Sequence, residues 1–491
     1  MLQSIEARTG AAIGEHWAES TPADISAAVR ASSAAADAFA TSSAAQRAEL
    51  LRALAAVLEA DREALVALAD RESGLDLPRL NGELDLTTFQ LRGFADVIER
   101  GDAHAFIDDA AVASAPPAGR PHLMRVRVPV GPVAMFSASN FPFAFSVLGG
   151  DTASALAAGC PVVVKGHPAH PGLSRCTAAL AQKVVAAQDL QPGVFQFVEG
   201  DSVDVGVALV QAPAIAAVAF TGSFKGGTAL AKIASERPRP IPFYGELGSV
   251  NPLVVLPAAI AKNGAELART LAASICLGAG QFCTSPGVIV VPKDAAGDGF
   301  VDAFSKALQA TQPHAMLSAG IRATFDRGVA QWRAAPQLKP LVNDVVDATV
   351  QAPRPFLAEV SAADFIANHA LHEEVFGPAA LVVRVASSDE AIDVLKAVGG
   401  SLTVTLWGAE AESDATHRLV RAATQIAGRV LFAGVPTGVA VTAAQHHGGP
   451  FPASTQPFTT SVGYAALDRF LRPVALQDAP SWLIERKGVP C

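Results

Sequence analysis

The sequence lacks three features that would assign it to a simple class of protein. Its 491 residues contain no run of about 18 apolar residues free of glycine, proline or polar breaks, so no membrane-spanning helix is expected. The first residues, MLQSIEARTG, lack a basic stretch followed by an apolar one, so no secretory signal is expected. Lysine and arginine form no stripe and the net charge is -9, which argues against nucleic acid as a partner.

Cysteine is scarce. The five cysteines, at positions 160, 176, 276, 283 and 491, form no CxxC pair and show no histidine spacing typical of zinc, so no metal site is predicted. An odd number of cysteines without an export signal is typical of reduced thiols in the cytoplasm, where we expect this protein.

Apolar residues are abundant, at 50% of the chain, whereas charged residues make up only 17%. The apolar excess is mostly alanine and valine, which fits helices packed on a buried parallel sheet and subunit interfaces that bury further surface. A chain of this length predicts two or three domains.

Hydrophobic periodicity predicts helices over 23–72 and about 82–100. A loop around 112–121 then precedes a partly exposed strand in HLMRVRVPVG. From Gly131 onward strands alternate with helices, and a second such series begins at 252–257. This pattern predicts an α/β fold with two parallel-sheet domains.

Cys283 lies in GAGQFCTSPG, where glycines and a proline predict a tight loop between a helix and the strand VIVV. A thiol on such a loop can be exposed and activated, but a lone cysteine is more often structural, and the residues alone leave both interpretations open. Cys276, in an apolar helical run, is expected in the core.

Two polar residues follow strand-like segments. Glu246 in FYGELGSVNP can act as a general base whose pKa burial raises, or as a turn carboxylate that accepts backbone N–H bonds. Asn140 in SASNFPF can donate to an oxyanion, or cap a turn before Pro142. In isolation the structural interpretation of each is the simpler one.

Two further segments can hold a cofactor, and a third contains a charge and an aromatic side chain. The turn FTGSFKGG, with Gly222 and Gly227, presents backbone N–H groups to a phosphate, although the usual G-x-G-x-x-G is absent. Lys165 leaves the strand VVVK and can hold ribose hydroxyls or phosphate, or remain solvated. Glu374 and Phe376 in HEEVFGP are, taken alone, a loop charge and a packed aromatic.

Together and in this order, the segments SASNFPF, VVVKGHP, FTGS-x-x-x-G, ELGSVNP, GQFCTSPG and EEVFGP resemble the aldehyde dehydrogenase superfamily over nearly the whole chain. The resemblance implies NAD(P)-dependent oxidation of an aldehyde to a carboxylic acid through a thioester on Cys283. It implies that Glu246 is the general base and that Asn140, with the backbone N–H of Cys283, holds the oxyanion.

The resemblance also assigns the binding residues. It implies a cofactor site formed by Lys165, His167, Pro168, Gly222, Ser223, Gly227, Glu374 and Phe376. It implies a substrate pocket lined by Leu86, Phe141, Phe282 and Thr284.

The segments KGHPAHPG, GELGSVNP, GQFCTSPG, PTGVAV, HGGPFPAS and TTSVG, with RFLRPV, resemble the NADP-preferring 2-oxoglutarate semialdehyde (2,5-dioxopentanoate) dehydrogenases. Many relatives carry at the position of Pro168 a glutamate that binds the adenosine ribose. Its loss removes repulsion against a 2'-phosphate, and Lys165, His167 and His170 can add favourable contacts. NADP is therefore expected as the preferred cofactor, beside NAD.

Two departures from that subfamily bear on the substrate. Leu86 stands where many members have arginine, and residues 432–435 (FAGV) stand where they tend to have asparagine and tryptophan. A less polar aldehyde is therefore a second candidate substrate, unless Arg92 replaces the missing arginine. A CoA-acylating enzyme, against which Glu246 argues, and a non-catalytic relative with the same fold also remain open.

The resemblance implies a cofactor-binding domain over 1–116 and 137–248, a catalytic domain over 249–469, and a β bridging element over 117–136 and 470–491. Exposed strands of the bridging element would pair with another subunit, so a homodimer or homotetramer is expected.

Overall fold

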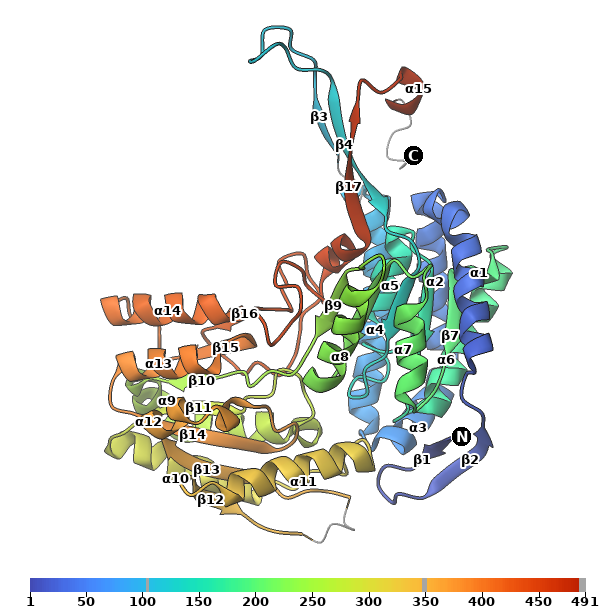
Figure 1. The fold of residues 1–491 in the computed structure, drawn as a ribbon. Helices are drawn as coiled ribbons and strands as arrows, with labels where there is room; N and C mark the ends of the chain where they lie inside the picture. Colours follow the sequence, from blue (N-terminus) through green and yellow to red (C-terminus); the bar gives the residue numbers. More distant parts are fainter. Residues whose placement is uncertain (103–105, 347–350, 485–491) are drawn as a thin grey trace.

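The computed structural model describes residues 1–102, 106–346 and 351–484, and within these ranges the strands form four sheets. Two sheets with their helices make up two α/β halves that lie side by side, and a three-stranded sheet projects from the body (Figure 1). The predicted fold class, two parallel-sheet domains with a small β element, is confirmed.

The first half contains five parallel strands. In spatial order they are β7 (Phe195–Val198), β6 (Val162–Lys165), β5 (Val133–Phe136), β8 (Ala217–Thr221) and β9 (Phe243–Glu246). Val133 and Met135 of β5 face one apolar core, while Ala134 and Phe136 face another. Helices cover both faces, which is why these strands are nearly continuous apolar runs. The chain reverses its strand order beside β5, and ligands of open α/β sheets bind at such a point.

The helices of this half are α1 (Pro22–Ala40), α2 (Ala44–Ala60), α3 (Arg62–Ser73), α4 (Leu77–Glu99), α5 (Gly150–Ala158), α6 (Pro171–Ala187), η2 (Pro192–Val194), α7 (Val203–Gln211) and α8 (Phe224–Glu236). The helices expected over 23–72 are α1, α2 and α3. The helix expected from 82 begins earlier, at Leu77, because the Asp76 side chain accepts from the Arg79 N–H and caps the first turn.

The second half contains seven strands, parallel except where β12 meets β13. In spatial order they are β12 (Lys339–Asn343), β13 (Phe356–Ser361), β14 (Ala379–Val385), β11 (Val288–Pro292), β10 (Leu253–Val255), β15 (Ser401–Trp407) and β16 (Ala427–Leu431). Its helices are α9 (Pro257–Cys276), η3 (Leu277–Gly280), α10 (Ala295–Ala310), α11 (Ala319–Ala334), α12 (Ala362–Ala367), η4 (His369–His372), α13 (Ser388–Val398) and α14 (Asp414–Ile426).

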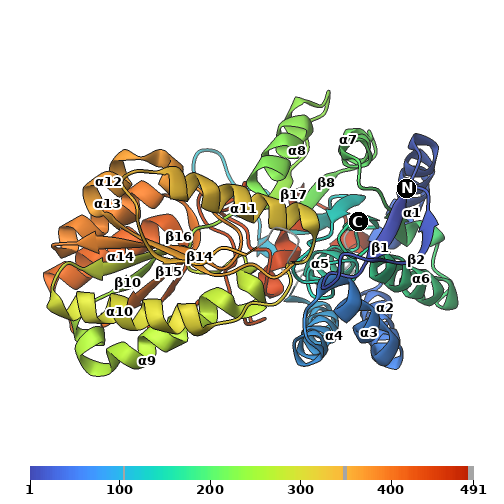
Figure 2. The ribbon, with the colours of Figure 1, turned by 90° about the horizontal axis from the view of Figure 1, so that it is seen from below.

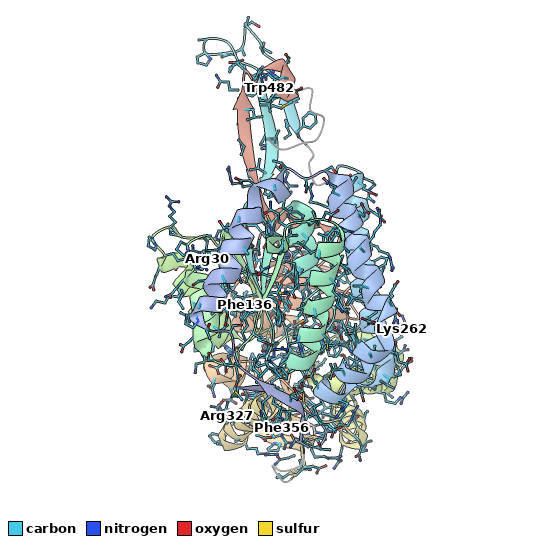
Figure 3. The ribbon with its side chains drawn as sticks, turned by 90° about the vertical axis from the view of Figure 1, so that its right-hand side faces the viewer. Arg30, Phe136, Lys262, Arg327, Phe356 and Trp482 are labelled. Carbon is cyan, nitrogen blue, oxygen red and sulfur yellow. The ribbon has the colours of Figure 1, made fainter. Side chains whose placement is uncertain are left out.

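The projecting sheet has the order β17 (Leu471–Gln477), β4 (Leu123–Pro129) and β3 (Ile107–Asp109), and η5 (Tyr464–Phe470) leads into it. Figure 3 shows Trp482 of α15 (Ser481–Ile484) beside this arm, far from Phe136 in the body. Two strands differ from the expected bridging ranges. Strand β5 falls within 117–136 but pairs with β6 and β8, and β3 falls outside but pairs with β4. The four apolar residues of β5 are buried on both faces, as a central strand requires.

A short hairpin, β1 (Leu2–Ile5) with β2 (Ala12–Trp17), begins the chain and contacts α6, as the view from below shows (Figure 2).

The candidate functional residues lie at the ends of other strands. Asn140, Lys165, Ser223 and Glu246 follow or end β5, β6, β8 and β9 at the carboxyl edge of the five-stranded sheet, whereas Cys283 precedes β11 of the other sheet. The candidate site therefore lies where the two halves meet.

Candidate active site

The loop that carries Cys283 is fixed by unusual backbone geometry. Gly278, Ala279 and Gly280 all have positive φ (57°, 54° and 71°), and a left-handed alanine stores strain that its surroundings must hold in place. Asn251, itself left-handed and buried, donates its side-chain amide to the carbonyls of Cys283 (2.7 Å) and Ser285 (3.1 Å). The predicted tight loop is thus present and pinned on both sides of the thiol.

The same loop packs against the turn that carries Glu374 and Phe376. A Cβ at Gly280 would lie 2.2 Å from the carbonyl carbon of Gly377, so only glycine fits here. Two segments almost a hundred residues apart are thereby locked together.

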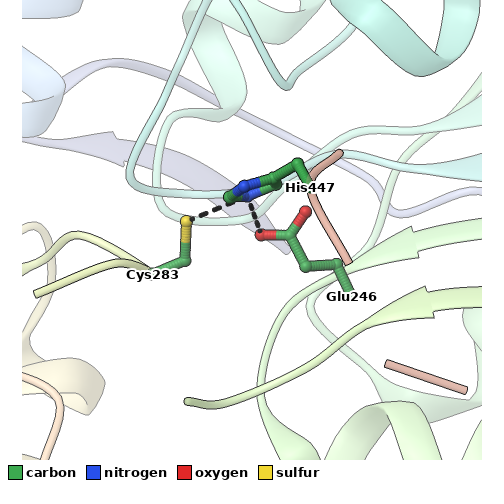
Figure 4. A group of neighbouring side chains, drawn as sticks. All are labelled: Glu246, Cys283 and His447. Carbon is green, nitrogen blue, oxygen red and sulfur yellow. Dashed lines mark hydrogen bonds and ion pairs between the residues drawn. The ribbon is translucent and has the colours of Figure 1, made fainter. Parts of the chain in front are cut away.

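Figure 4 shows the group that surrounds the thiol. Nε2 of His447 lies 3.6 Å from Sγ of Cys283 and 3.0 Å from Oε1 of Glu246. Ser461 Oγ donates to the other oxygen of Glu246 at 2.5 Å. The structure thus brings Cys283 and Glu246 together, as the predicted roles require.

His447 is a site residue that the sequence alone does not assign. It is 1% exposed, its backbone N–H donates to Thr460 Oγ1 (2.8 Å), and its Nδ1 has no hydrogen-bond partner among the described residues. Because Nε2 faces a carboxylate, it carries the ring proton when the imidazole is neutral. The segment HGGPFPAS begins with this histidine, and a histidine beside two glycines was the available signal.

The pKa values of the group follow from burial and from these contacts. Burial, and then the proximity of the Glu246 carboxylate, raise the pKa of the Cys283 thiol well above its usual value. Burial also acts to raise the pKa of Glu246, but His447, Ser461 and the thiol outweigh burial and hold that pKa below its usual value. The resting pair is therefore a thiol beside a carboxylate.

Asn140 reaches the Cys283 loop from the other half of the molecule. Its Nδ2 donates to the carbonyl of Gln281 at 2.9 Å, which uses one amide hydrogen and leaves the second available. The ring of Phe141 packs edge-on against Phe282, with centroids 5.3 Å apart. The neighbours of Asn140 and Cys283 are thus in contact, and this contact aligns the two loops.

The expected pocket residues lie around that contact. Leu86 packs against the cluster of Phe141, Ala144 and Phe282, and Thr284 is buried directly after Cys283. Leu86 therefore contacts the apolar cluster that contains the neighbours of Asn140 and Cys283.

The glycine turn after β8 contacts the backbone of Glu246. The Gly222 N–H donates to the Glu246 carbonyl at 3.1 Å, and Ser223 caps α8 by accepting from the Gly226 N–H at 3.2 Å. A Cβ at Gly227 would lie 2.2 Å from the Leu247 side chain, so glycine permits this close approach. The N-terminus of α8 can thus present backbone donors to a phosphate close to Glu246.

Burial lowers the pKa values of two basic side chains at and after the end of β6, Lys165 and His167. Burial lowers the pKa of Lys165 to about 8, although Asp201 and Glu19 act in the opposite direction. Burial, with the nearby His170 and Lys165, lowers the pKa of His167 well below its usual value, so its ring is neutral. His167 and Pro168 line one small pocket.

Glu374 and Phe376, the other two residues expected to bind the cofactor, line a pocket together with Phe282. Burial raises the pKa of Glu374 to about 8, partly offset by the backbone N–H of Ser249. A Cβ at Gly248 would lie 2.5 Å from a carboxylate oxygen of Glu374. Glu374 therefore approaches the segment that directly follows Glu246.

The profile of the Aldehyde dehydrogenase family matches residues 2–322, about two thirds of the sequence. The chain belongs to the aldehyde dehydrogenase family. Members oxidise small aldehydes with NAD or NADP, so this aldehyde dehydrogenase is an oxidoreductase that acts on the aldehyde group.

Two relatives of this aldehyde dehydrogenase extend over nearly the whole chain. Alpha-ketoglutaric semialdehyde dehydrogenase 2 of Azospirillum brasilense is 44% identical over 448 residues, which cover 90% of this chain and 85% of the relative. Alpha-ketoglutaric semialdehyde dehydrogenase of Acinetobacter baylyi is 39% identical over 440 residues, which cover 89% and 83%.

Solved structures show the fold of this aldehyde dehydrogenase. The succinic semialdehyde dehydrogenase of Streptococcus pyogenes in complex with NADP+ superposes with a TM-score of 0.81 at 17% identity, covering 98% of this chain and all of that one. The NAD-dependent aldehyde dehydrogenase of Sinorhizobium meliloti gives 0.79 at 22% identity, covering 98% and 92%.

Two side chains of this aldehyde dehydrogenase do not take the contacts considered for them. Arg92 forms a bidentate ion pair with Glu59 on the surface (2.6 and 2.7 Å), so it does not replace an arginine at position 86. His170 is buried, with its ring nitrogens facing Ser174 Oγ and the Ala138 carbonyl, so it is not free to meet a phosphate.

Among the described helices, none has the length and apolar character needed to cross a membrane.

Proposed function

We propose that this aldehyde dehydrogenase oxidises 2-oxoglutarate semialdehyde to 2-oxoglutarate. Support for the substrate comes from the two relatives of that specificity, which are 44% and 39% identical over about nine tenths of the chain. The observation that carries the chemistry is the contact of Cys283 with His447 and Glu246.

In the proposed reaction Cys283 is the nucleophile, and its thiol must first lose a proton. His447 Nε2 lies 3.6 Å from Sγ, and the Glu246 carboxylate lies within 4.8 Å. Because the Nε2–H of His447 donates to Glu246, the carboxylate is the acceptor of the thiol proton, and that proton leaves to solvent before the hydrolysis step. Sγ then bonds to the aldehyde carbon.

Asn140 and the backbone N–H of Cys283 hold the developing oxyanion, each worth about 3 kcal/mol. NAD or NADP, when bound, supplies the hydride acceptor, and a thioester on Cys283 results. Glu246, ionised because of its contacts with His447 and Ser461, takes a proton from the water that hydrolyses the thioester.

The residues of the cofactor region fit a dinucleotide. The N-terminus of α8 offers donors for the pyrophosphate, Lys165 a cation for the adenosine ribose, and Glu374 a polar group for the nicotinamide ribose. NADP is proposed as the preferred cofactor because Pro168 carries no charge that would repel a 2'-phosphate. The favourable charge comes from Lys165, since His167 is neutral.

The decisive experiment measures kcat/KM for a panel from 2-oxoglutarate semialdehyde to long-chain and aromatic aldehydes, with NAD and NADP. The 2-oxo acid should be the best substrate. Cys283→Ala should abolish turnover of every aldehyde while nucleotide binding, measured by fluorescence, persists. A wild-type enzyme that prefers aromatic aldehydes, or a Cys283→Ala variant that remains active, contradicts the proposal.

A less polar aldehyde is the second candidate, and the apolar packing of Leu86 in the pocket favours it. A CoA-acylating enzyme would need no hydrolytic base, and Glu246 beside the thiol argues against it. Chromatography of the product, acid or acyl-CoA, separates these two chemistries.

We also propose a homodimer or homotetramer in the cytoplasm. Strand β17 lies at an open edge of the projecting sheet, and apolar side chains of that arm are exposed, among them Ile107 and Trp482. An exposed strand edge of this kind is usually covered by a partner strand. Light scattering gives the number of subunits.

A further inference from the structure

One cation of the pocket wall has no role in the reaction described above. Arg79, in the first turn of α4, lies with its Cζ 4.3 Å from the ring centroid of Phe141 and 5.1 Å from that of Phe282. Phe141 directly follows Asn140, and Phe282 directly precedes Cys283. The guanidinium therefore packs on the neighbours of both groups that meet the aldehyde.

One side of this guanidinium is held by a buried carboxylate. Glu83, one helical turn further on, accepts from Nη1 of Arg79 at 2.9 Å through Oε2. Its Oε1 accepts from the backbone N–H groups of Phe143 (2.7 Å) and Ala144 (3.0 Å). Glu83 thus fixes both Arg79 and the loop after β5.

The hydrogen-bond donors on the other side of the guanidinium have no partner among the described residues. Nε and Nη2 of Arg79 are buried and have no hydrogen-bond partner among the described residues. These two nitrogens form one edge of the planar group, with parallel N–H bonds spaced to match the two oxygens of a carboxylate. Buried donors of a charged group are costly to leave unpaired, which points to an anion as their partner.

The helical register places Arg79 on the same face of α4 as Leu86, a residue of the expected substrate pocket. Arg79 and Leu86 are seven residues apart, two turns along the same face of α4. Leu86 packs on the Phe141–Phe282 cluster, and Arg79 contacts the same two rings. An arginine two turns earlier can therefore serve the pocket in place of one at position 86.

We propose that the Nε–Nη2 edge of Arg79 binds the carboxylate of the substrate and so selects an aldehyde that ends in an acid. This inference rests on the proposed function, since it takes the substrate to be a 2-oxo acid with a terminal aldehyde. The side chain of Arg79 is 19% exposed, but Nε and Nη2 are themselves buried, so binding of the carboxylate requires the Phe141 or Phe282 ring to rotate.

The test compares two aldehydes of equal chain length, 2-oxoglutarate semialdehyde and neutral pentanal, in the wild type and in Arg79→Met. For the acidic aldehyde, kcat/KM should fall about 10- to 100-fold, mainly through KM, because a bidentate charged contact is lost. For pentanal it should stay within about threefold of wild type. Arg92→Met, on the same helix but paired with Glu59 at the surface, is the matched control and should leave both values unchanged.

A second variant guards against misfolding, because Arg79→Met leaves Glu83 buried without its cation. Arg79→Met/Glu83→Gln keeps a carbonyl acceptor for the Phe143 and Ala144 N–H groups and should show the same loss of discrimination. An equal loss for both aldehydes, in both variants, assigns Arg79 a structural role and overturns the inference, as does an unchanged preference for the acid.

Binding of 2-oxoglutarate, measured by calorimetry in Cys283→Ala, separates this inference from the proposed function. Binding that weakens at least about tenfold when Arg79→Met is added supports the carboxylate subsite even if 2-oxoglutarate semialdehyde is not the best substrate. Binding that is absent, or unaffected by Arg79→Met, overturns the subsite.

Discussion

Two glutamates of this aldehyde dehydrogenase lie near Cys283, yet their carboxyl groups differ in charge. Glu246 faces His447 and Ser461, and its pKa lies below the usual value. Burial raises the pKa of Glu374 to about 8, and only the hydrogen bond from the backbone N–H of Ser249 acts to lower it. At neutral pH the first is a carboxylate and the second is largely an acid.

This contrast shows that burial alone does not set the charge of a site residue. Desolvation disfavours both carboxylates, and only a partner that stabilises the charged form reverses the effect. His447 and Ser461 supply that stabilisation to Glu246, the proposed base. Three substitutions test this contrast directly, and a fourth adds a new carboxylate at another position.

The largest effect is expected from His447→Gln. Loss of the imidazole raises the pKa of Glu246, the group that accepts the thiol and water protons, so kcat/KM should fall about 10²- to 10⁴-fold. The acid limb of the pH–rate profile should move to higher pH. His446→Gln, one residue earlier, should keep near wild-type activity. Equal losses in both variants would show that the segment matters only structurally.

A similar or smaller effect is expected from Glu246→Gln, which keeps the shape of the base but not its charge. Thioester formation should survive while hydrolysis slows about 10²-fold or more, so stopped-flow absorbance should show a burst of about one NADPH per subunit followed by a slow phase. Ser461→Ala, which removes only one hydrogen bond to Glu246, should give a milder loss. The absence of a burst contradicts a hydrolytic role.

The substitution Pro168→Glu adds a carboxylate where the adenosine ribose of the cofactor is proposed to bind. Repulsion of a 2'-phosphate should lower kcat/KM for NADP about tenfold relative to NAD. Pro168→Gln, which adds the same bulk without charge, is the control. A wild-type enzyme that already prefers NAD would remove the basis of the proposed cofactor preference.

The smallest effect concerns Glu374→Gln in the absence of nucleotide. The pKa of Glu374 is raised to about 8 in the folded state, so the protonated group stabilises the fold fully below its ordinary pKa, and that contribution is lost as pH rises toward 8. The variant should therefore gain thermal stability relative to wild type between pH 5 and 8, by about 2 °C or more in Tm. A constant difference across this range contradicts the raised pKa.

Much of the fold was predictable because its signals are local. The periodicity of α1 to α4 and the alternation from β5 onward follow from residues a few positions apart. Glycines marked the loop at Cys283, and a strand pattern marked the end of β9 at Glu246. The bridging ranges were less accurate, because β3 and β5 are short segments whose sheet depends on distant partners.

The amino-acid sequence alone specifies which groups are available: a loop thiol, a strand-end carboxylate and a strand-end amide, in the order typical of aldehyde dehydrogenases. The partners of these groups follow from the three-dimensional fold. His447 lies 164 residues after Cys283 and 201 after Glu246, and Arg79 lies far along the chain from both rings that it contacts. Such contacts have no local signature, because they arise where two separately folded sheets bring their loops together, and the charge of each buried group depends on them.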